Sequence, residues 1–407
     1  MSKPFAITLN IGTSLANHTG SWRSERPVYV HNLPPCNDAC PAGEDIQGWL
    51  YEAEAGGYEK AWKHLTKDNP FPAIMGRICY HPCQSACNRK DVDEAVGINS
   101  VERFLGDKAI ESGWVFEKPA TKSGKRILVV GSGPSGLSAA YHLAKLGHEV
   151  LIRESAKEPG GMMRYGIPAY RLPREVLDAE IARLVEMGVV IQCDSKVTDA
   201  ESALKEGFDA VFLAIGAHLG KRAYIPAGDT VRILDAVNVL HMTADGQPPL
   251  LGRRVVVYGG GNTAMDAART AKRLGAYEAI VVYRRTKAQM PAHETELKEA
   301  LEEGVVMRWL STIAWVNSGA VTIEKMVLDE NGKPQPTGEF ESIEADSVVL
   351  ALGQDVDLSV VEGINEISVN DGVIEAWLEE PGREDNCPTD PYNVSSPEYV
   401  LWYLATR

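Results

Sequence analysis

The sequence predicts an α/β protein, in which a helical domain precedes two doubly wound domains of parallel strands and helices, the second inserted into the first. At 407 residues the chain is longer than one typical core, so two or three domains are expected. Before residue 119, apolar side chains recur every three or four residues, as on one face of a helix, in the segments 44–56, 58–65 and 101–110. Beyond the polar, turn-rich segment 119–124, short apolar runs bounded by glycine alternate with amphipathic stretches, which indicates buried parallel strands and covering helices.

The charge balance excludes several classes of partner. The 41 basic and 56 acidic residues give a net charge of −15, which repels nucleic-acid phosphates and anionic membranes. No apolar run approaches the roughly 20 residues of a membrane-spanning helix. The first residues also lack the basic, apolar and small-residue order of a secretory signal. We therefore expect a cytoplasmic protein that neither binds nucleic acid nor inserts into a membrane.

The first strand–glycine–helix unit begins near residue 126. A strand at 127–130 leads into Gly131-x-Gly133-x-x-Gly136, an amphipathic helix follows, and a second strand at 149–153 ends at Glu154. In such a motif the first glycine allows a tight turn, the second lets a pyrophosphate approach, and the third lets helix and strand pack closely. The acid stands where it can accept hydrogen bonds from ribose hydroxyls. In this context the motif predicts dinucleotide binding rather than a plain glycine turn.

A second unit begins near residue 253 and repeats the fingerprint as Gly259-x-Gly261-x-x-Ala264, with the alanine that the pattern permits. Its second strand ends in Arg284 and Arg285 instead of an acid. Arginine at this point suits the 2′-phosphate of NADP, so NADP is favoured over NAD. A solvated pair of basic side chains at a strand end is the alternative.

Each unit closes with a similar strand and glycine, at 209–216 (DAVFLAIG) and 346–353 (DSVVLALG), unless these are two unrelated strands. Two nucleotide-binding, Rossmann-like folds in one chain, the second within the first, are typical of an FAD domain that receives hydride from an NAD(P) domain.

Five of the seven cysteines cluster in the helical domain, spaced as Cys36-x3-Cys40 and Cys79-x3-Cys83-x3-Cys87. Structural zinc, which needs only four donors, and unliganded buried thiols are alternatives. Beside two redox nucleotide folds, the cluster favours iron–sulfur chemistry, because thiolates bind iron and a flavin needs a one-electron outlet. The two remaining cysteines form no C-x-x-C pair, which argues against a disulfide reductase.

Seven segments carry a resemblance to a known family: PPCNDACPAGEDIQGWL, GRICYHPCQSACNR, INSVERF, GSGPSGL, EPGGMMRYGIPAYRLP, GGGNTAMDAAR and VVYRRTKAQMPA. Together they resemble the FAD- and iron–sulfur-containing small subunit of glutamate synthase and its relatives. These include the amino-terminal half of dihydropyrimidine dehydrogenase, the large subunit of NADH-dependent ferredoxin:NADP oxidoreductase, and electron-transfer subunits of some 2-oxoacid oxidoreductases. The resemblance covers residues 30–360.

The resemblance implies one [4Fe-4S] cluster held by Cys40, Cys79, Cys83 and Glu102, with the glutamate where relatives use a ligand other than cysteine. Without the family, Glu102 would be interpreted as a charged residue on the exposed face of its helix.

A second family cluster takes four cysteines, of which two correspond to Cys36 and Cys87. The other two positions fall on Val28 and His31. This cluster is therefore absent, ligated by His31, or completed by another chain, and an unmatched pair of buried thiols is the remaining interpretation.

The cofactor positions also follow from the resemblance. For FAD they are Gly131, Gly133, Pro134, Ser135, Gly136, Glu154, Gly161 and Arg171. For NADP or NAD they are Gly260, Gly261, Asn262, Thr263, Arg284 and Arg285, together with the backbone of Ala351, Leu352 and Gly353. No catalytic side chain is implied, because the cofactors carry the chemistry.

The expected domain boundaries follow the motifs. They are an N-terminal extension (1–29), a helical iron–sulfur domain (30–118), the FAD domain (119–218 and 351–407) and the NAD(P) domain (219–350). The last segment is incomplete or divergent, because relatives end in an apolar-Ala-Gly-Gly-Asp run that binds the flavin and this sequence has none. Either this subgroup binds FAD without that run, or the sequence is altered or truncated near Glu375.

The function implied is that of an NAD(P)H:acceptor oxidoreductase subunit, a flavoprotein that passes electrons from nicotinamide through FAD to iron. No motif for thiamine diphosphate, glutaminase or pyrimidine chemistry is found, so the organic substrate is expected on partner subunits, with a ferredoxin-like carrier as a further partner. The sequences of the two cysteine segments, PPCNDACPAGEDIQ and GRICYHPC, resemble those of subunits that accompany 2-oxoacid oxidoreductases, such as phenylglyoxylate dehydrogenase, and favour that assignment. The alternatives are the glutamate synthase small subunit and a non-catalytic assembly subunit with a decayed flavin site.

Overall fold

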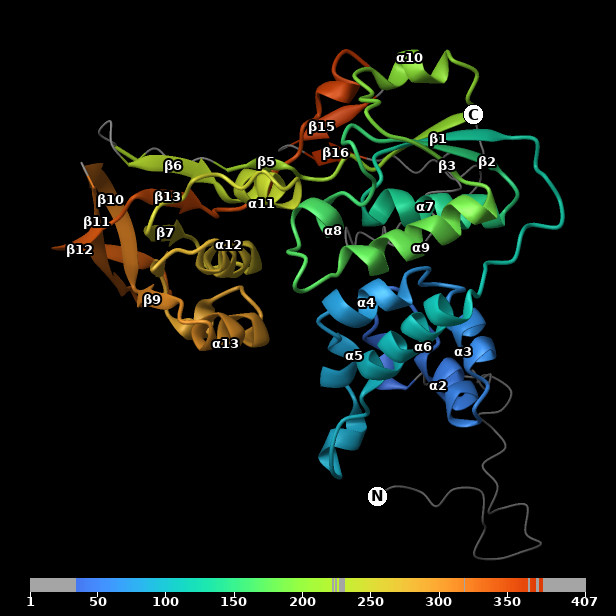
Figure 1. The fold of residues 1–407 in the computed structure, drawn as a ribbon, viewed down its shortest axis with the longest axis horizontal. Coiled ribbons are helices and arrows are strands. Elements are labelled where there is room, and N and C mark those ends of the chain that lie inside the picture. The colour runs from blue at the N-terminus through green and yellow to red at the C-terminus, as the bar shows by residue number, and fades with distance from the viewer. Residues whose placement is uncertain are drawn as a thin grey trace, which may run out of the picture.

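The computed structural model describes residues 34–364 except 222, 224, 227–230 and 318, together with 367–370 and 373–375. The predicted extension, Val28, His31 and the segment beyond Glu375 lie outside the described residues. Three parts are seen in Figure 1: a helical domain, a first α/β unit whose helices α7 and α9 face it, and a second α/β unit beside the first.

The helical domain contains the three predicted helices, as α2 (Ile46–Glu54), α3 (Tyr58–Leu65) and α6 (Ile98–Ser112). The first begins later than expected because Asp45 caps it, accepting a hydrogen bond from the Gly48 N–H. Three short helices start at prolines, whose missing N–H costs nothing in a first turn: α1 (Pro35–Asp38), α4 (Pro72–Ile78) and α5 (Pro82–Ser85). The apolar faces of α2, α3 and α6 meet in a core that contains Trp49, Leu65 and Leu105, all fully buried.

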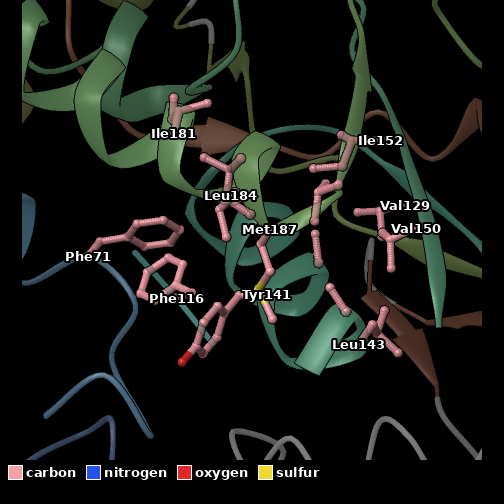
Figure 2. Packing of buried hydrophobic residues seen from close by; sticks show 14 of the residues in the cluster. Phe71, Phe116, Val129, Tyr141, Leu143, Val150, Ile152, Ile181, Leu184 and Met187 are labelled. Carbon is pink, nitrogen blue, oxygen red and sulfur yellow. The ribbon is translucent and has the colours of Figure 1, made fainter. Parts of the chain in front are cut away.

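The first α/β unit is a parallel sheet of order β3-β2-β1-β4. Its elements run β1 (Arg126–Val130), α7 (Pro134–Lys145), β2 (Glu149–Arg153), α8 (Met162–Tyr165), α9 (Arg174–Met187), β3 (Val190–Gln192), α10 (Ala200–Leu204) and β4 (Ala210–Leu213). Helices α7 and α9 cover one face, where Val129, Ile152 and Leu184 meet in the core (Figure 2).

The second unit is a five-stranded parallel sheet of order β6-β13-β7-β8-β9. It is built from β6 (Arg232–Asp235), α11 (Ala236–Ala244), β7 (Arg254–Tyr258), α12 (Asn262–Arg273), β8 (Glu278–Tyr283), α13 (Glu294–Glu302), β9 (Val306–Trp309) and β13 (Ser347–Leu350). An antiparallel sheet of β10 (Ser311–Asn317), β11 (Ala320–Leu328) and β12 (Pro334–Glu344) covers the face opposite α12, a feature the sequence analysis did not anticipate.

The chain enters and leaves the second unit through two paired strands, β5 (Leu219–Gly220) and β14 (Gln354–Asp355). Beyond them, Val360 and Val361 in a short 3-10 helix (Ser359–Val361) return to the first unit and pack beside Ala200 of α10. Strands β15 (Ser368–Asn370) and β16 (Val373–Glu375) follow as an antiparallel pair. The second unit is therefore inserted into the first, as the sequence predicted.

The two predicted closing strands are equivalent. Strand β4 pairs with β1 and β13 pairs with β7, each in parallel. Asp209 before β4 accepts a hydrogen bond from the Arg126 N–H, and Asp346 before β13 accepts from the Arg254 N–H. The repeated pattern thus reflects one local structure built twice, and the alternative of two unrelated strands is wrong.

The helical domain is joined to the first unit by an apolar boundary that contains one buried ion pair. Phe71, Trp62 and Phe116 pack with the core of the first unit, and Figure 2 shows Phe71 and Phe116 on the side of Leu184 and Tyr141. Glu180 and Arg183 of α9 form an ion pair at 3.0 Å, and Glu180 also accepts from the Ile74 N–H of α4.

In the part of the chain that the structure describes, no helix combines the length and the apolar character needed to cross a bilayer.

The ion pair leads to a pH dependence of stability. Burial raises the pKa of Glu180 to about 7, against the opposing charge of Arg183. Between about pH 5.5 and 7 the folded carboxyl keeps a proton that the unfolded chain has released, so stability should fall by about 2 kcal/mol as pH rises. In Glu180→Gln this contribution should vanish, as measured by denaturant unfolding across the range. Glu201→Gln, in an exposed pair with Lys205, is the control and should follow the wild type. Parallel curves for Glu180→Gln and the wild type would contradict the assignment.

Candidate cofactor sites

The turn after β1 has the geometry that the three glycines were predicted to allow. Gly131 takes φ +101°, and a Cβ there would lie 2.4 Å from the Ala214 carbonyl oxygen. A Cβ on Gly136 would lie 1.9 Å from the Gly131 oxygen. By contrast, nothing lies within 4 Å of a Cβ built on Gly133. Two glycines therefore serve the fold, and the third leaves space in front of a helix.

Helix α7 starts at Pro134, directly behind that space. Its N-cap, Gly133, offers no side-chain acceptor, so the first N–H groups, including that of Ser135, are left for an anion. Gly161 borders the same space, because a Cβ on it would lie 2.6 Å from the Gly133 Cα. A diphosphate fits this cradle, since any side chain at Gly133 would fill it.

Glu154 is buried at the end of β2 and is fixed by the glycine loop. One carboxylate oxygen accepts from the Ser132 N–H and hydroxyl at 2.8 and 2.6 Å, and the other accepts from the Ala156 N–H at 2.8 Å. The acid predicted to bind ribose is therefore held beside the cradle by hydrogen bonds from the chain itself.

The second cradle repeats the first. Gly259 takes φ +149°, with a Cβ position 2.2 Å from the Ala351 oxygen, and the space in front of Gly261 is open. Helix α12 begins at Asn262 without a side-chain cap, with Thr263 next in its first turn. Gly260 is required by the Tyr283 ring, which a Cβ would approach to 2.4 Å.

Two further predicted groups surround this cradle. Ala351 donates its N–H to the Tyr258 oxygen at 2.8 Å, which places the segment to Gly353 beside the glycine loop. Arg284 is exposed and Arg285 half-buried just after β8, and neither forms an ion pair within the described residues. Their guanidinium groups are therefore available to a ligand phosphate.

Arg171 lies between the two α/β units. It contacts Asp266 of α12 at 2.7 Å, Glu296 of α13 at 2.5 Å and, at 3.5 Å, the hydroxyl of Tyr80 from the helical domain. The Tyr80 ring stacks on His293 at 4.6 Å. The FAD contact implied for Arg171 stays a prediction, and the structure adds that this side chain connects all three parts.

The predicted cluster ligands come together in the helical domain. Burial raises the pKa of the thiols of Cys40, Cys79 and Cys83, to about 11 for Cys40 and about 12 for Cys83, and the charge of Glu102 adds a smaller increase to each. Glu102 itself is only 7% exposed, so the interpretation as an exposed helix-face residue is wrong. Three thiols and one carboxylate are a donor set that suits an iron–sulfur cluster, and their assignment as its ligands stays a prediction.

Cys36 and Cys87 are the two thiols that correspond to the second family cluster. The charge of Cys87 contributes to the raised pKa of Cys36, after the larger effect of burial, whereas backbone N–H groups, first that of Val96, lower the pKa of Cys87. His31, the implied third ligand, lies outside the described residues. All described cysteines are free thiols.

Among the residues that the structure describes, no three His, Cys, Asp or Glu side chains converge closely enough for a single metal ion. A four-iron cluster spreads its ligands around a cube rather than a point, so this finding concerns single-ion sites such as structural zinc.

Sequence reasoning missed two buried residues beside the thiols. Glu44 is 6% exposed, and burial raises its pKa to about 7 although Asn69 and Trp49 donate hydrogen bonds to it. The same Asn69 amide donates to Glu102 at 2.8 Å. The only sequence signal was their position near the cysteines, because the contacts join segments far apart in the chain.

Two family comparisons divide the chain where the structure does. Residues 14–114 match the family described as dihydropyrimidine dehydrogenase domain II, 4Fe-4S cluster. Residues 117–376, more than half of the chain, match the family described as pyridine nucleotide-disulphide oxidoreductase.

Curated relatives resemble the chain across both parts. It is 36% identical over 382 residues to the NADP(+)-dependent formate dehydrogenase subunit beta of Moorella thermoacetica, covering 82% of this chain and 52% of that protein. It is 31% identical to the glutamate synthase [NADPH] small chain of Escherichia coli, covering 79% and 74%, respectively. With the NAD-dependent dihydropyrimidine dehydrogenase subunit PreT of Salmonella typhimurium it shares 32% identity, covering 81% and 79%. The chain spans about half the length of the first of these relatives.

Solved structures share the fold. FprA, an oxidoreductase of Mycobacterium tuberculosis, superposes with a TM-score of 0.50 at 21% identity, covering 57% of this chain and 71% of that chain. 2-Naphthoyl-CoA reductase gives the same TM-score at 22% identity, covering 72% and 45%. With the matches to both sequence families, these findings show that the chain belongs to the FAD- and [4Fe-4S]-containing NAD(P)H oxidoreductases that include the glutamate synthase small chain and a dihydropyrimidine dehydrogenase subunit.

Proposed function

We propose that this chain is the electron-input subunit of a larger redox complex, which takes electrons from NADPH and delivers them to partner subunits or a ferredoxin-like carrier. One observation carries the proposal: two open glycine cradles and a thiol–carboxylate donor set occur in one chain, with the cluster domain packed directly on the first α/β unit. When bound, the flavin would accept hydride from the nicotinamide and release single electrons to the cluster.

The residues of the chain would bind and orient these groups. The N-terminus of α7 and Glu154 would hold the FAD pyrophosphate and ribose, while α12 would hold the second dinucleotide. Cys40, Cys79, Cys83 and Glu102 would hold one cluster. The boundary between the helical domain and the first unit is apolar and fully buried at Leu184 and Ile74, so it would fix the distance from cluster to flavin.

We propose a complex because the sequence has no motif for thiamine diphosphate, glutaminase or pyrimidine chemistry, so that a partner subunit would act on the organic substrate. The sequence of the cysteine segments, PPCNDACPAGEDIQ and GRICYHPC, supports a partnership with a 2-oxoacid oxidoreductase of the phenylglyoxylate type. Relatives that are named as beta subunits or small chains support a multi-subunit assembly. The glutamate synthase small chain is the second candidate, favoured by its 74% coverage. A reducing, cytoplasmic compartment suits the free thiols. Purification of the native complex and identification of its subunits decide between these assignments.

The electron path is tested with Cys83→Ser. Anaerobic NADPH should bleach the flavin of both wild type and variant, because the dinucleotide cradles are untouched. Only the wild type should then reduce an added ferredoxin-type acceptor, and the variant should lose iron and sulfide. A wild-type protein without flavin absorbance would instead support the non-catalytic assembly subunit and contradict the proposal.

The FAD cradle is tested with two glycine substitutions. Gly133→Ala has room for its methyl group, so it should fold with near-native stability but retain little FAD, since the methyl occupies the diphosphate space. Gly136→Ala should lose both FAD and stability, because its Cβ would overlap the Gly131 oxygen. Flavin content after purification and unfolding of the FAD-free forms are the measurements. Full flavin content in Gly133→Ala would refute the cradle.

The proposed preference for NADPH over NADH is tested by substituting the two arginines that follow β8. Stopped-flow reduction should be faster with NADPH than with NADH, because Arg284 and Arg285 can pair with the 2′-phosphate. The double variant Arg284→Ala/Arg285→Ala should raise the KM for NADPH by about tenfold or more, as expected for a lost charged hydrogen bond, and leave the KM for NADH unchanged. Arg308→Ala, on the next strand and paired with Glu341, is the control. Faster reduction of the wild type by NADH would overturn this assignment.

A further inference from the structure

We propose that Asn69 is a positioning residue of the iron–sulfur site, whose side-chain amide fixes the carboxyl groups of Glu44 and Glu102 within the helical domain. The inference rests on the proposed role of Glu102 as a ligand. It adds a residue and a hydrogen-bond network that bear on the geometry and reduction potential of the cluster.

Asn69 lies between α3 and α4 and is buried, with 6% exposure. Its Nδ2 donates to Oε1 of Glu102 at 2.8 Å and to Oε1 of Glu44 at 3.0 Å. Its Oδ1 accepts from the Phe71 N–H at 3.0 Å. One planar amide therefore joins the entry of α2, the middle of α6 and the start of α4.

The orientation of this amide follows from its three partners. Rotation of the side chain by half a turn would place the amide oxygen against two carboxylates and leave the Phe71 N–H without an acceptor. Each such loss in a buried position is unfavourable, because the group left without a partner has also lost its water. The two Nδ2 hydrogens must therefore point at the two carboxyl groups.

The surroundings distinguish the two carboxyl groups. Glu44 has both oxygens occupied, one by Asn69 and the other by the Trp49 indole N–H at 3.2 Å. Glu102 acts electrostatically on Cys40, Cys79 and Cys83, whereas Glu44 acts on the first two. The charge of Glu102 therefore reaches all three thiols, and Glu44 is a second carboxyl group beside Cys40 and Cys79.

Asn69 has a direct effect on the proposed ligand because it occupies one of its oxygens. Groups that hydrogen-bond to a metal ligand set its direction and basicity, and hydrogen bonds and net charge tune cluster potentials. A neutral amide between two carboxyl groups also separates like charges without adding another. Removing its donors should let Glu102 turn and should change the electronic structure of the cluster.

The experiment compares Asn69→Asp with Asn37→Asp in the full-length protein. Both changes replace an amide by a carboxyl of the same shape. Asn37 also donates to a carboxylate, Asp45 at 3.0 Å, and accepts from the Gln47 N–H and, at 3.7 Å, from the thiol of Cys36, which is not among the proposed ligands of the cluster with Glu102. It therefore controls for a general loosening of the helical domain. Iron, sulfide and flavin contents, the EPR spectrum of the reduced cluster and its midpoint potential are measured.

We expect Asn69→Asp to shift the g values and the midpoint potential, or to lose iron, while flavin content and bleaching by NADPH stay native and Asn37→Asp keeps the wild-type cluster signals. Wild-type signals in Asn69→Asp would overturn the inference, as would equal changes in both variants. If Asn69→Asp does not fold, Asn69→Ser provides the comparison, because one hydroxyl cannot donate to both carboxyl groups. A wild type without any cluster signal would defeat the proposed function itself.

Discussion

Both nucleotide cradles depend on one close approach of backbone to backbone. The oxygens of Ala214 and Ala351 lie where any side chain on Gly131 or Gly259 would stand. This contact sets each central strand against its closing strand and turns the chain directly into a helix whose first N–H groups are uncapped. The placement of Glu154, of Arg284 and of the inserted unit all follow from that geometry. Because each contact is made between strands far apart in sequence, each cradle forms only when its sheet is complete.

Much of this architecture could be predicted from sequence because it is local. Glycine spacing, apolar runs and the acid or arginine after the second strand fall within about 30 residues, which a pattern can capture. The β10–β12 sheet was not anticipated, because its strands are recognised by their packing on Val256 and Ile280 rather than by a motif. The burial of Glu102 was equally out of reach. Its carboxyl group is hydrogen-bonded to Asn69, which lies 33 positions earlier in the chain and which no local pattern connects to it.

Buried carboxyl groups recur from the thiols to the first α/β unit. Glu44, Glu102 and Glu180 have raised pKa values, first of all because of burial, and the charges of Glu44 and Glu180 add to the shift of Glu102. The Asn69 amide donates to Glu44 and Glu102, and the Trp49 indole donates to Glu44. Glu180 accepts from the guanidinium of Arg183 and from the backbone N–H of Ile74. Acidic groups of this kind are costly without such partners. The residues that donate hydrogen bonds to these carboxyl groups therefore shape the surroundings of the thiols as much as the proposed ligands do.

The two boundaries of the first α/β unit differ in chemistry. Toward the helical domain it is apolar and aromatic, and separation would expose Trp62, Phe116 and Phe71 to water. Toward the inserted unit it includes Arg171 with its carboxylates, Tyr170 against the guanidinium of Arg273, and the ring of Tyr165 stacked on His241. Charged groups that part from each other recover hydration, whereas apolar faces do not. Rehydration of charged groups would therefore offset part of the cost of separating the second boundary but not of the first, and the paired strands β5 and β14 are the two chain connections to the inserted unit.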